Sequence, residues 1–470
     1  MPFPACGWMP VNADRPFVRA SAEDRARQAI TAQTRFGWGV TPDVAARIAD
    51  DPVGWIEGQI AKGAPALPPG PTAQQALLAA EAIARARVAN DAAGDERLRK
   101  TLNAMVRSEG AKRIALAVRT DQPFADRWAA FWSNHFAIST NRAGLRGVGG
   151  AFEREAIRPH AFGRFADMLG AVATHPAMMV YLDNGSSFGP TSRAGMRAGR
   201  GVNENYAREV LELHTLGVDG GYTQADVEEL ALALTGWTVR RTPRRKPSHP
   251  EDGTFQFWRG AHEPGARTLL GRTYGQRDQE QGMAMLRDLA RHPATARHIA
   301  RKLARHFVSD LPPAALIDRL AATFLWTEGD LAALARELVR SPEAWDAPAA
   351  RFLPPIDFVV AAARALPAAQ PPNRLWQATR RMGQPLWAPP SPAGYDQGGG
   401  EWFGPEGLGL RLAHANTSAD RTDPGADVPA HAIRLYGQAI DDRLLETLRR
   451  AEAARQGFTL LLMSPQLLRR

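Results

Sequence analysis

Three polar side chains lie one helical turn apart in the segment 203–217. Asn205, Glu209 and Glu212 are spaced at i, i+4 and i+7, and at about 100° per residue they stack on one face of a helix. Two neighbouring carboxylates can bind a divalent cation, or can act as general acid and base if their environments differ. The sequence therefore predicts a catalytic or metal site on this helix, in which Asn205 orients a substrate.

Two histidines are the predicted companions of this carboxylate pair. His135 follows Trp128, Phe131 and Trp132 at helical spacing, so its ring is expected on an aromatic face that points into the core. If His135 met the two glutamates, the three side chains would form a carboxylate–histidine metal centre. His262 begins the turn His-Glu-Pro-Gly, and loop residues often carry function, so we expect it to bind substrate.

A structural interpretation competes with each of these predictions. Glu209 and Glu212 could pair with arginines elsewhere in the fold, and His135 could be an ordinary core residue. His298, Lys302 and His306 share one helical face that could bind an anion or line a solvated surface. Ser187 lies in a Gly-x-Ser-x-Gly pattern, but a helix precedes it and a glycine-rich loop follows, which is not the context of a nucleophile elbow.

Helical periodicity with marked start signals predicts a mostly α fold. Thr41-Pro42, Asp51-Pro52 and Thr223 with Asp226 each resemble the start of a helix. We expect an N-terminal extension over 1–20 and one large multi-helical domain over 21–470. Within that domain we expect three irregular segments: a mobile loop at 185–202, an excursion at 238–280 with a small β-hairpin near 254–270, and a Pro/Gly-rich stretch at 383–410.

The composition restricts the partners and the compartment. Net charge is +9, and almost all of the 58 basic residues are arginine, a bias that base composition of the gene alone can produce, so nucleic acid is not the expected partner. Cys6 is the single cysteine, which excludes an intrachain disulfide. We see no transmembrane segment and no export signal, which predicts a cytoplasmic protein.

Several motifs together resemble the bacterial domain-of-unknown-function 1800 family. They are residues 131–136 (Phe-Trp-Ser-Asn-His-Phe), 175–178 (His-Pro-Ala-Met), 203–217, 220–227, 234–237 (Leu-Thr-Gly-Trp), 262–265 and 292–300. The resemblance implies a mostly helical protein. It also implies frequent export, so a periplasmic location is a second expectation, and an envelope-associated protein partner.

Two functional hypotheses follow. The first is a metal-assisted hydrolytic or oxidative enzyme, with Glu209, Glu212 and His135 as metal ligands or acid–base groups, and a divalent metal ion as cofactor. The alternative is a non-catalytic accessory or scaffold protein of cell-envelope or polysaccharide assembly, in which the same polar residues specify helix packing.

Overall fold

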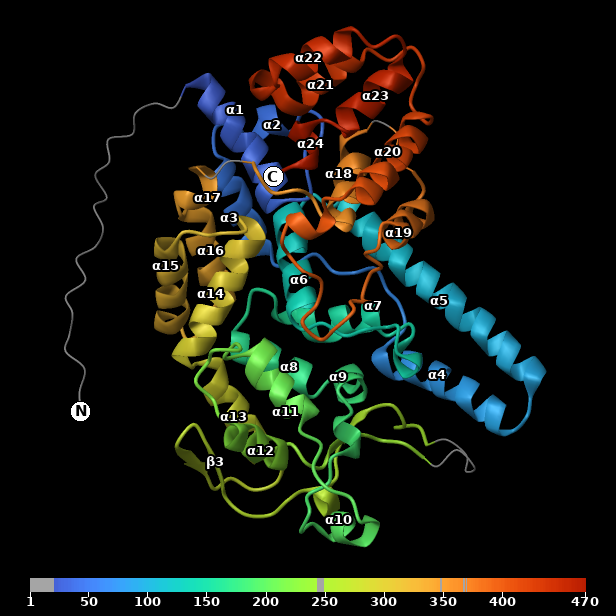
Figure 1. Cartoon of the computed structure of the whole chain (residues 1–470), viewed down its shortest axis with the longest axis vertical. Helices are drawn as coiled ribbons and strands as arrows, with labels where there is room; N and C mark the ends of the chain where they lie inside the picture. Colours follow the sequence, from blue (N-terminus) through green and yellow to red (C-terminus); the bar gives the residue numbers. More distant parts are fainter. Residues whose placement is uncertain (1–20, 243–248, 347–348, 367, 369) are drawn as a thin grey trace, which may run out of the picture.

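The structure is a computed structural model that describes residues 21–242, 249–346, 349–366, 368 and 370–470. It is mostly α, as predicted, and the described residues form 24 α-helices and two small antiparallel sheets. The C-terminal helices and the first helices lie at one end of the molecule, and α8–α13 with the strands lie at the other (Figure 1). The predicted N-terminal extension lies outside the described residues.

The helices have the following bounds. The first third of the chain forms α1 Ala22–Thr31, α2 Val44–Ile48, α3 Pro52–Lys62, α4 Ala73–Val88, α5 Ala92–Arg119, α6 Pro123–His135 and α7 Gly149–Phe152. The middle forms α8 Phe165–Ala173, α9 Pro176–Tyr181, α10 Arg193–Ala198, α11 Asn205–Glu209, α12 Gln224–Ala233, α13 Gln279–Ala290, α14 Pro293–Phe307, α15 Ala314–Trp326, α16 Leu331–Arg340 and α17 Glu343–Asp346. The last part forms α18 Pro355–Ala365, α19 Pro372–Arg381, α20 Pro405–Ala419, α21 Val428–Tyr436, α22 Asp442–Arg449, α23 Ala454–Leu462 and α24 Pro465–Leu468.

The predicted β excursion is present and consists of two pairs of short strands. β1 (Trp237–Val239) pairs with β2 (Phe255–Phe257), and β3 (Arg267–Leu269) pairs with β4 (Arg272–Tyr274). β2 and β3 thus lie in different two-stranded sheets, and the β structure extends beyond the expected range of 254–270 on both sides. The other two irregular segments contain helices as well, because α10 lies within 185–202 and α20 begins at Pro405.

Side-chain caps explain where several helices begin. Asp51 accepts a hydrogen bond from the Gly54 amide at 2.8 Å, and Thr223 forms a reciprocal capping box with Asp226, both as predicted. The prediction at Thr41-Pro42 was wrong by two residues, since α2 begins at Val44. There Asp43 adopts φ 62° and pairs with Arg434, so a tertiary contact delays the start of the helix.

Buried apolar side chains form two clusters. The larger cluster spans α1 to α17 and includes the aromatic face of α6, where Trp128, Phe131 and Trp132 are fully buried. The smaller cluster joins α18 to α24 with Trp38 and one face of α5. Because α5 and α6 contact both clusters, they hold the two halves of the molecule together. In the described part of the chain, no helix is long and apolar enough to cross a membrane.

Candidate functional site

The predicted central helix is shorter and less regular than its sequence suggests. α11 ends at Glu209, and a π-helical turn, Val210–His214, continues it. The Thr215 hydroxyl donates to the Val210 carbonyl at 2.7 Å, which holds the wide turn closed. Gly217, at φ 86°, ends the segment, as a glycine after a helix C-terminus does. Turns of this π type occur frequently at functional sites.

Glu209 and Glu212 lie together on this segment, and both are half-buried. Burial, and then the charge of Glu212, raise the pKa of the Glu209 carboxyl, while Arg208 acts in the opposite direction. Arg208 itself pairs with Glu204 at 3.1 Å. Among the described residues, neither carboxylate of the pair has a salt bridge to a basic side chain, so the predicted pairing with arginines does not occur here.

Two tyrosines that sequence reasoning missed complete this cluster. Burial raises the pKa of Tyr222, as do the charge of Glu212 and a hydrogen bond to it. Burial, and then the charge of Glu209, raise the pKa of Tyr181 to about 12. Both phenols therefore stay protonated at neutral pH and can donate a hydrogen bond. Tyr222 lies in the family-like motif 220–227, but no spacing rule connects either tyrosine with the central helix.

Asn205 connects the central segment with the end of α9. Its side-chain amide donates to the Leu182 carbonyl at 3.3 Å, and the residue is exposed. Its position on α11 agrees with the predicted role of orienting a substrate beside the carboxylates, a role that stays a prediction. Asn205, Glu209, Glu212, Tyr181 and Tyr222 together are called the carboxylate site below.

His135 lies in the aromatic core, where it contacts His214 at the end of the π turn. It is fully buried, its Nε2 donates to the His214 carbonyl at 3.2 Å, and its ring packs against Phe131 and Phe136. Burial, and then the charge of Lys302, lower the pKa of His135 well below its ordinary value. Among the described residues, no hydrogen bond, ion pair or ring contact joins His135 to Glu209 or Glu212.

The face of α14 that carries Lys302 also packs into this region. The pKa of Lys302 is lowered to about 8 by burial, and the Nε2 of His298 donates to the Leu213 carbonyl at 3.1 Å. The expectation of a solvated face for His298, Lys302 and His306 was therefore wrong, because α14 turns this face toward α6 and the end of the π turn.

His262 fixes the turn that it begins, and it has no contact with the carboxylate site in the described structure. Its Nδ1 donates to the Thr235 carbonyl at 3.0 Å, and its ring packs against Phe257. The next residue, Glu263, accepts hydrogen bonds from Thr191, at 2.8 Å from the amide and 2.6 Å from the hydroxyl. These two hydrogen bonds attach the turn to the loop around Thr191.

The residues present do not assemble the ligand set of a metal centre. In the part of the chain that the structure describes, no group of three or more His, Cys, Asp or Glu side chains could hold a metal ion. Glu209 and Glu212 supply two carboxylates, and the neighbouring tyrosines are protonated. A divalent metal therefore stays an expectation from the sequence, and no step below depends on one.

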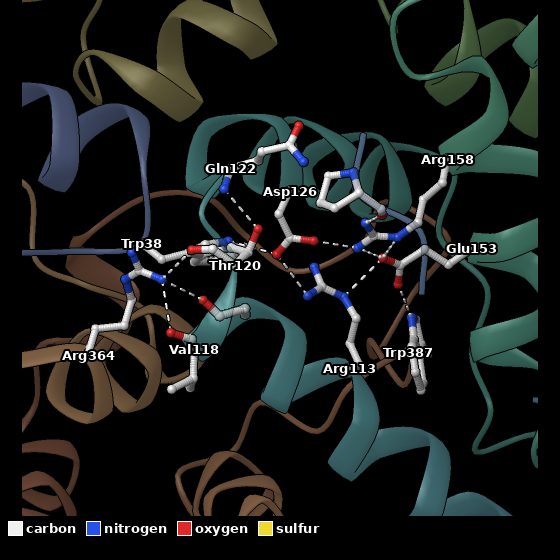
Figure 2. A network of polar contacts seen from close by, with 12 residues as sticks. Trp38, Arg113, Val118, Thr120, Gln122, Asp126, Glu153, Arg158, Arg364 and Trp387 are labelled. Carbon is white, nitrogen blue, oxygen red and sulfur yellow. Dashed lines mark hydrogen bonds and ion pairs between the residues drawn. The ribbon is translucent and has the colours of Figure 1, made fainter. Parts of the chain in front are cut away.

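A second polar cluster lies between α5, α6 and the segment after α7. Asp126 is bonded by Arg158 at 2.6 Å, by Arg113 at 3.1 Å and by the Trp38 indole at 2.8 Å. Glu153 bonds the same two arginines (Figure 2). Burial alone would raise the pKa of Asp126, but the two arginines outweigh it and hold the pKa below its usual value. We call these four charged residues the buried ion network.

Comparison with family models gives a match over nearly the whole chain. The family model described as "Protein of unknown function (DUF1800)" matches residues 31–469, nearly the whole chain, which confirms the resemblance noted in the sequence. No curated protein matches the chain, and no solved structure matches it.

Proposed function

The chain belongs to the DUF1800 family, and we propose that it is a hydrolytic enzyme in which Glu209 and Glu212 are the acid–base pair. One observation carries the proposal. Two half-buried carboxylates lie together, neither has a salt bridge to a basic side chain among the described residues, and burial and then the charge of Glu212 raise the pKa of Glu209. A fold that needs carboxylates only for packing pairs them with arginine, as this protein does in its buried ion network. Perturbed, unpaired carboxylates are typical of catalytic sites.

The two carboxyl groups differ in a way that assigns their roles. Glu209, whose pKa is raised, keeps its proton to higher pH and is the general acid. Glu212, bonded by the Tyr222 hydroxyl, is the general base. Glu212 takes a proton from water as the water oxygen bonds to the substrate, and Glu209 gives its proton to the leaving oxygen as the old bond breaks. Exchange with solvent then restores both groups.

The surroundings of the pair indicate the charge of the substrate. Two neighbouring carboxylates repel an anion, and the Tyr181 hydroxyl and the second N–H of the Asn205 amide offer neutral hydrogen-bond donors. We therefore expect a neutral, hydroxyl-rich substrate. His135 and His262 stay outside the reaction, because each bonds a backbone carbonyl and neither contacts Glu209 or Glu212 among the described residues.

The test measures hydrolysis of chromogenic glycosides and esters by purified protein. Glu209→Gln and Glu212→Gln should each lower kcat by about 10²–10⁴-fold, the usual contribution of general acid–base catalysis. Glu204→Gln is the matched control, because Glu204 lies on the same segment but pairs with Arg208, and this variant should keep its activity.

Three outcomes would contradict the proposal. They are no hydrolysis of any substrate, unchanged hydrolysis by both folded Gln variants, or an equal loss in Glu204→Gln. Elemental analysis of the same samples distinguishes a metal-assisted enzyme from a metal-free one. Stoichiometric metal that disappears in both Gln variants would indicate that Glu209 and Glu212 are metal ligands. An inactive, metal-free protein would instead support the accessory or scaffold role.

A further inference from the structure

A cavity of about 120 Å³ lies between α5, α6, the start of α18, the segment 384–397 and Arg470. No residue of the carboxylate site lines it, so it is a separate feature of the molecule. Most of its wall is apolar, formed by side chains that include Trp38, Ile114, Ala130, Ile138, Phe152 and Leu386. We call it the arginine cavity, because of the two arginines described next.

Arg351 and Arg470 are held side by side at one end of this cavity. Their backbones exchange hydrogen bonds at 3.2 and 2.9 Å, and residues opposite each other in such an antiparallel pair have their side chains on the same face. Both guanidinium groups bond the His306 carbonyl at the end of α14. The two residues are only 4% and 2% exposed, so two like charges are buried next to each other.

Aspartate side chains bond part of each guanidinium group around this cavity and leave other donors open. Asp357 is shared between Arg470 and Arg127, and Asp310 lies 3.3 Å from the Nε of Arg351. Other charged side chains on the wall are also paired, Arg113 with Glu153 in the buried ion network and Asp396 with Arg305 at 3.4 Å. Burial lowers the pKa of Arg351 to about 10, because the charged form loses its water.

Several hydrogen-bond donors beside these ion pairs have no partner in the described structure. The Nη2 of Arg351, the Nε of Arg470 and the Nε2 of Gln397 are buried without a hydrogen-bond partner in the described structure. All three side chains line the arginine cavity. Buried donors without a partner are uncommon and call for a physical reason, and an acceptor bound in the cavity would supply one.

We infer that the arginine cavity binds a small monocarboxylic acid whose apolar body fills the apolar part of the cavity. The carboxylate would accept from the unpartnered donors of Arg351, Arg470 and Gln397, because guanidinium donors match the planar geometry of a carboxylate. The volume of about 120 Å³ suits a small ligand. An apolar protein cavity of about 150 Å³ holds one benzene ring, so benzoate is a suitable probe.

The experiment measures binding of benzoate, benzamide and inorganic phosphate to the full chain by calorimetry. Benzoate should bind saturably, and benzamide, which has the same shape without the charge, at least 10-fold more weakly. Phosphate, which has the charge without the apolar ring, should also bind at least 10-fold more weakly. Arg351→Gln should weaken benzoate binding at least 10-fold. Arg297→Gln is the control, since Arg297 lies on α14 but pairs with Asp318 at the surface, and should leave the affinity unchanged.

A second variant keeps the inference testable if Arg351→Gln does not fold. Ala130→Leu adds apolar volume to the wall without changing any charge, and it should weaken benzoate binding at least 10-fold. Equal binding of benzamide and benzoate would overturn the inference, as would phosphate binding as tight as that of benzoate. Failure of benzoate to bind the wild-type protein at millimolar concentration, or unchanged affinity in Ala130→Leu, would also overturn it.

Discussion

The protein contains two pairs of acidic residues, Asp126 with Glu153 and Glu209 with Glu212. Their surroundings differ in every respect that matters for charge. The first pair is almost completely buried and bonded by Arg113 and Arg158. The second is half-buried, and Arg208 acts on it only at longer range. The pKa of Asp126 is lowered, whereas that of Glu209 is raised.

The difference shows that counter-charge, more than burial, separates a structural carboxylate from a reactive one. Asp126 is more deeply buried than Glu209, yet it holds its negative charge more firmly because two guanidinium groups compensate for the lost water. Glu209 loses less water but faces a second carboxylate. A substitution at Asp126 or Glu153 should therefore change mainly the free energy of unfolding. A substitution at Glu209 or Glu212 should change mainly proton transfer.

Asp126→Asn should have the largest effect. Removing one partner of a buried ion pair leaves the remaining charges uncompensated and costs about 3–5 kcal/mol of unfolding free energy. Here Arg113 and Arg158 would keep only Glu153. Urea unfolding followed by circular dichroism measures the change. The control is Asp318→Asn, which breaks the exposed pair with Arg297 and should cost no more than about 1 kcal/mol. Similar losses of unfolding free energy in Asp126→Asn and Asp318→Asn would contradict the expected difference between buried and exposed ion pairs.

The sequence predicted the position of the second pair but not the existence of the first. Helical spacing was enough to place Asn205, Glu209 and Glu212 on one segment, because 3.6-residue periodicity is a local property. The arginine pairing expected for Glu209 and Glu212 occurs instead at Asp126 and Glu153, which lie in different elements. Such pairing depends on how distant helices pack, and no spacing in the sequence carries that information.

Contacts between elements that are distant in the sequence also explain why other features of the candidate site could not be predicted. His135 was correctly expected on an aromatic, buried face, but its distance from the central helix depends on the packing of α6 against α14. Tyr222 approaches Glu212 only because the π turn and Gly217 reverse the chain. A π turn has no reliable sequence signature, since its residues also suit an ordinary α-helix.

The pH dependence of stability should have opposite signs at the two pairs. The folded-state pKa of Asp126 lies below its ordinary value of 3.8, so its contribution is present above that pH and is lost as the pH falls through the folded pKa. The melting temperature of the wild-type protein should therefore fall in acid, and that of Asp126→Asn should fall less steeply. Parallel acid profiles for the two proteins would show that Asp126 does not carry this dependence.

Glu209→Gln should have the smallest effect on stability, and in the opposite direction. The folded-state pKa of Glu209 lies above its ordinary value of 4.5, so its contribution is fully present below that pH and is lost as the pH rises through the folded pKa. At neutral pH the charged side chain thus destabilises the fold. Removing one of two like charges a turn apart should raise the unfolding free energy by about 0.2–0.5 kcal/mol.

That gain should disappear near pH 4, where the proton already neutralises Glu209, and urea unfolding at both pH values measures it. Glu204→Gln is again the control, because it removes a carboxylate that has a basic partner and should give no gain at neutral pH. A loss of stability in Glu209→Gln at neutral pH would mean that this carboxylate has a stabilising partner in solution. The carboxylate site would then resemble the buried ion network, and the assignment of Glu209 as a general acid would lose its physical basis.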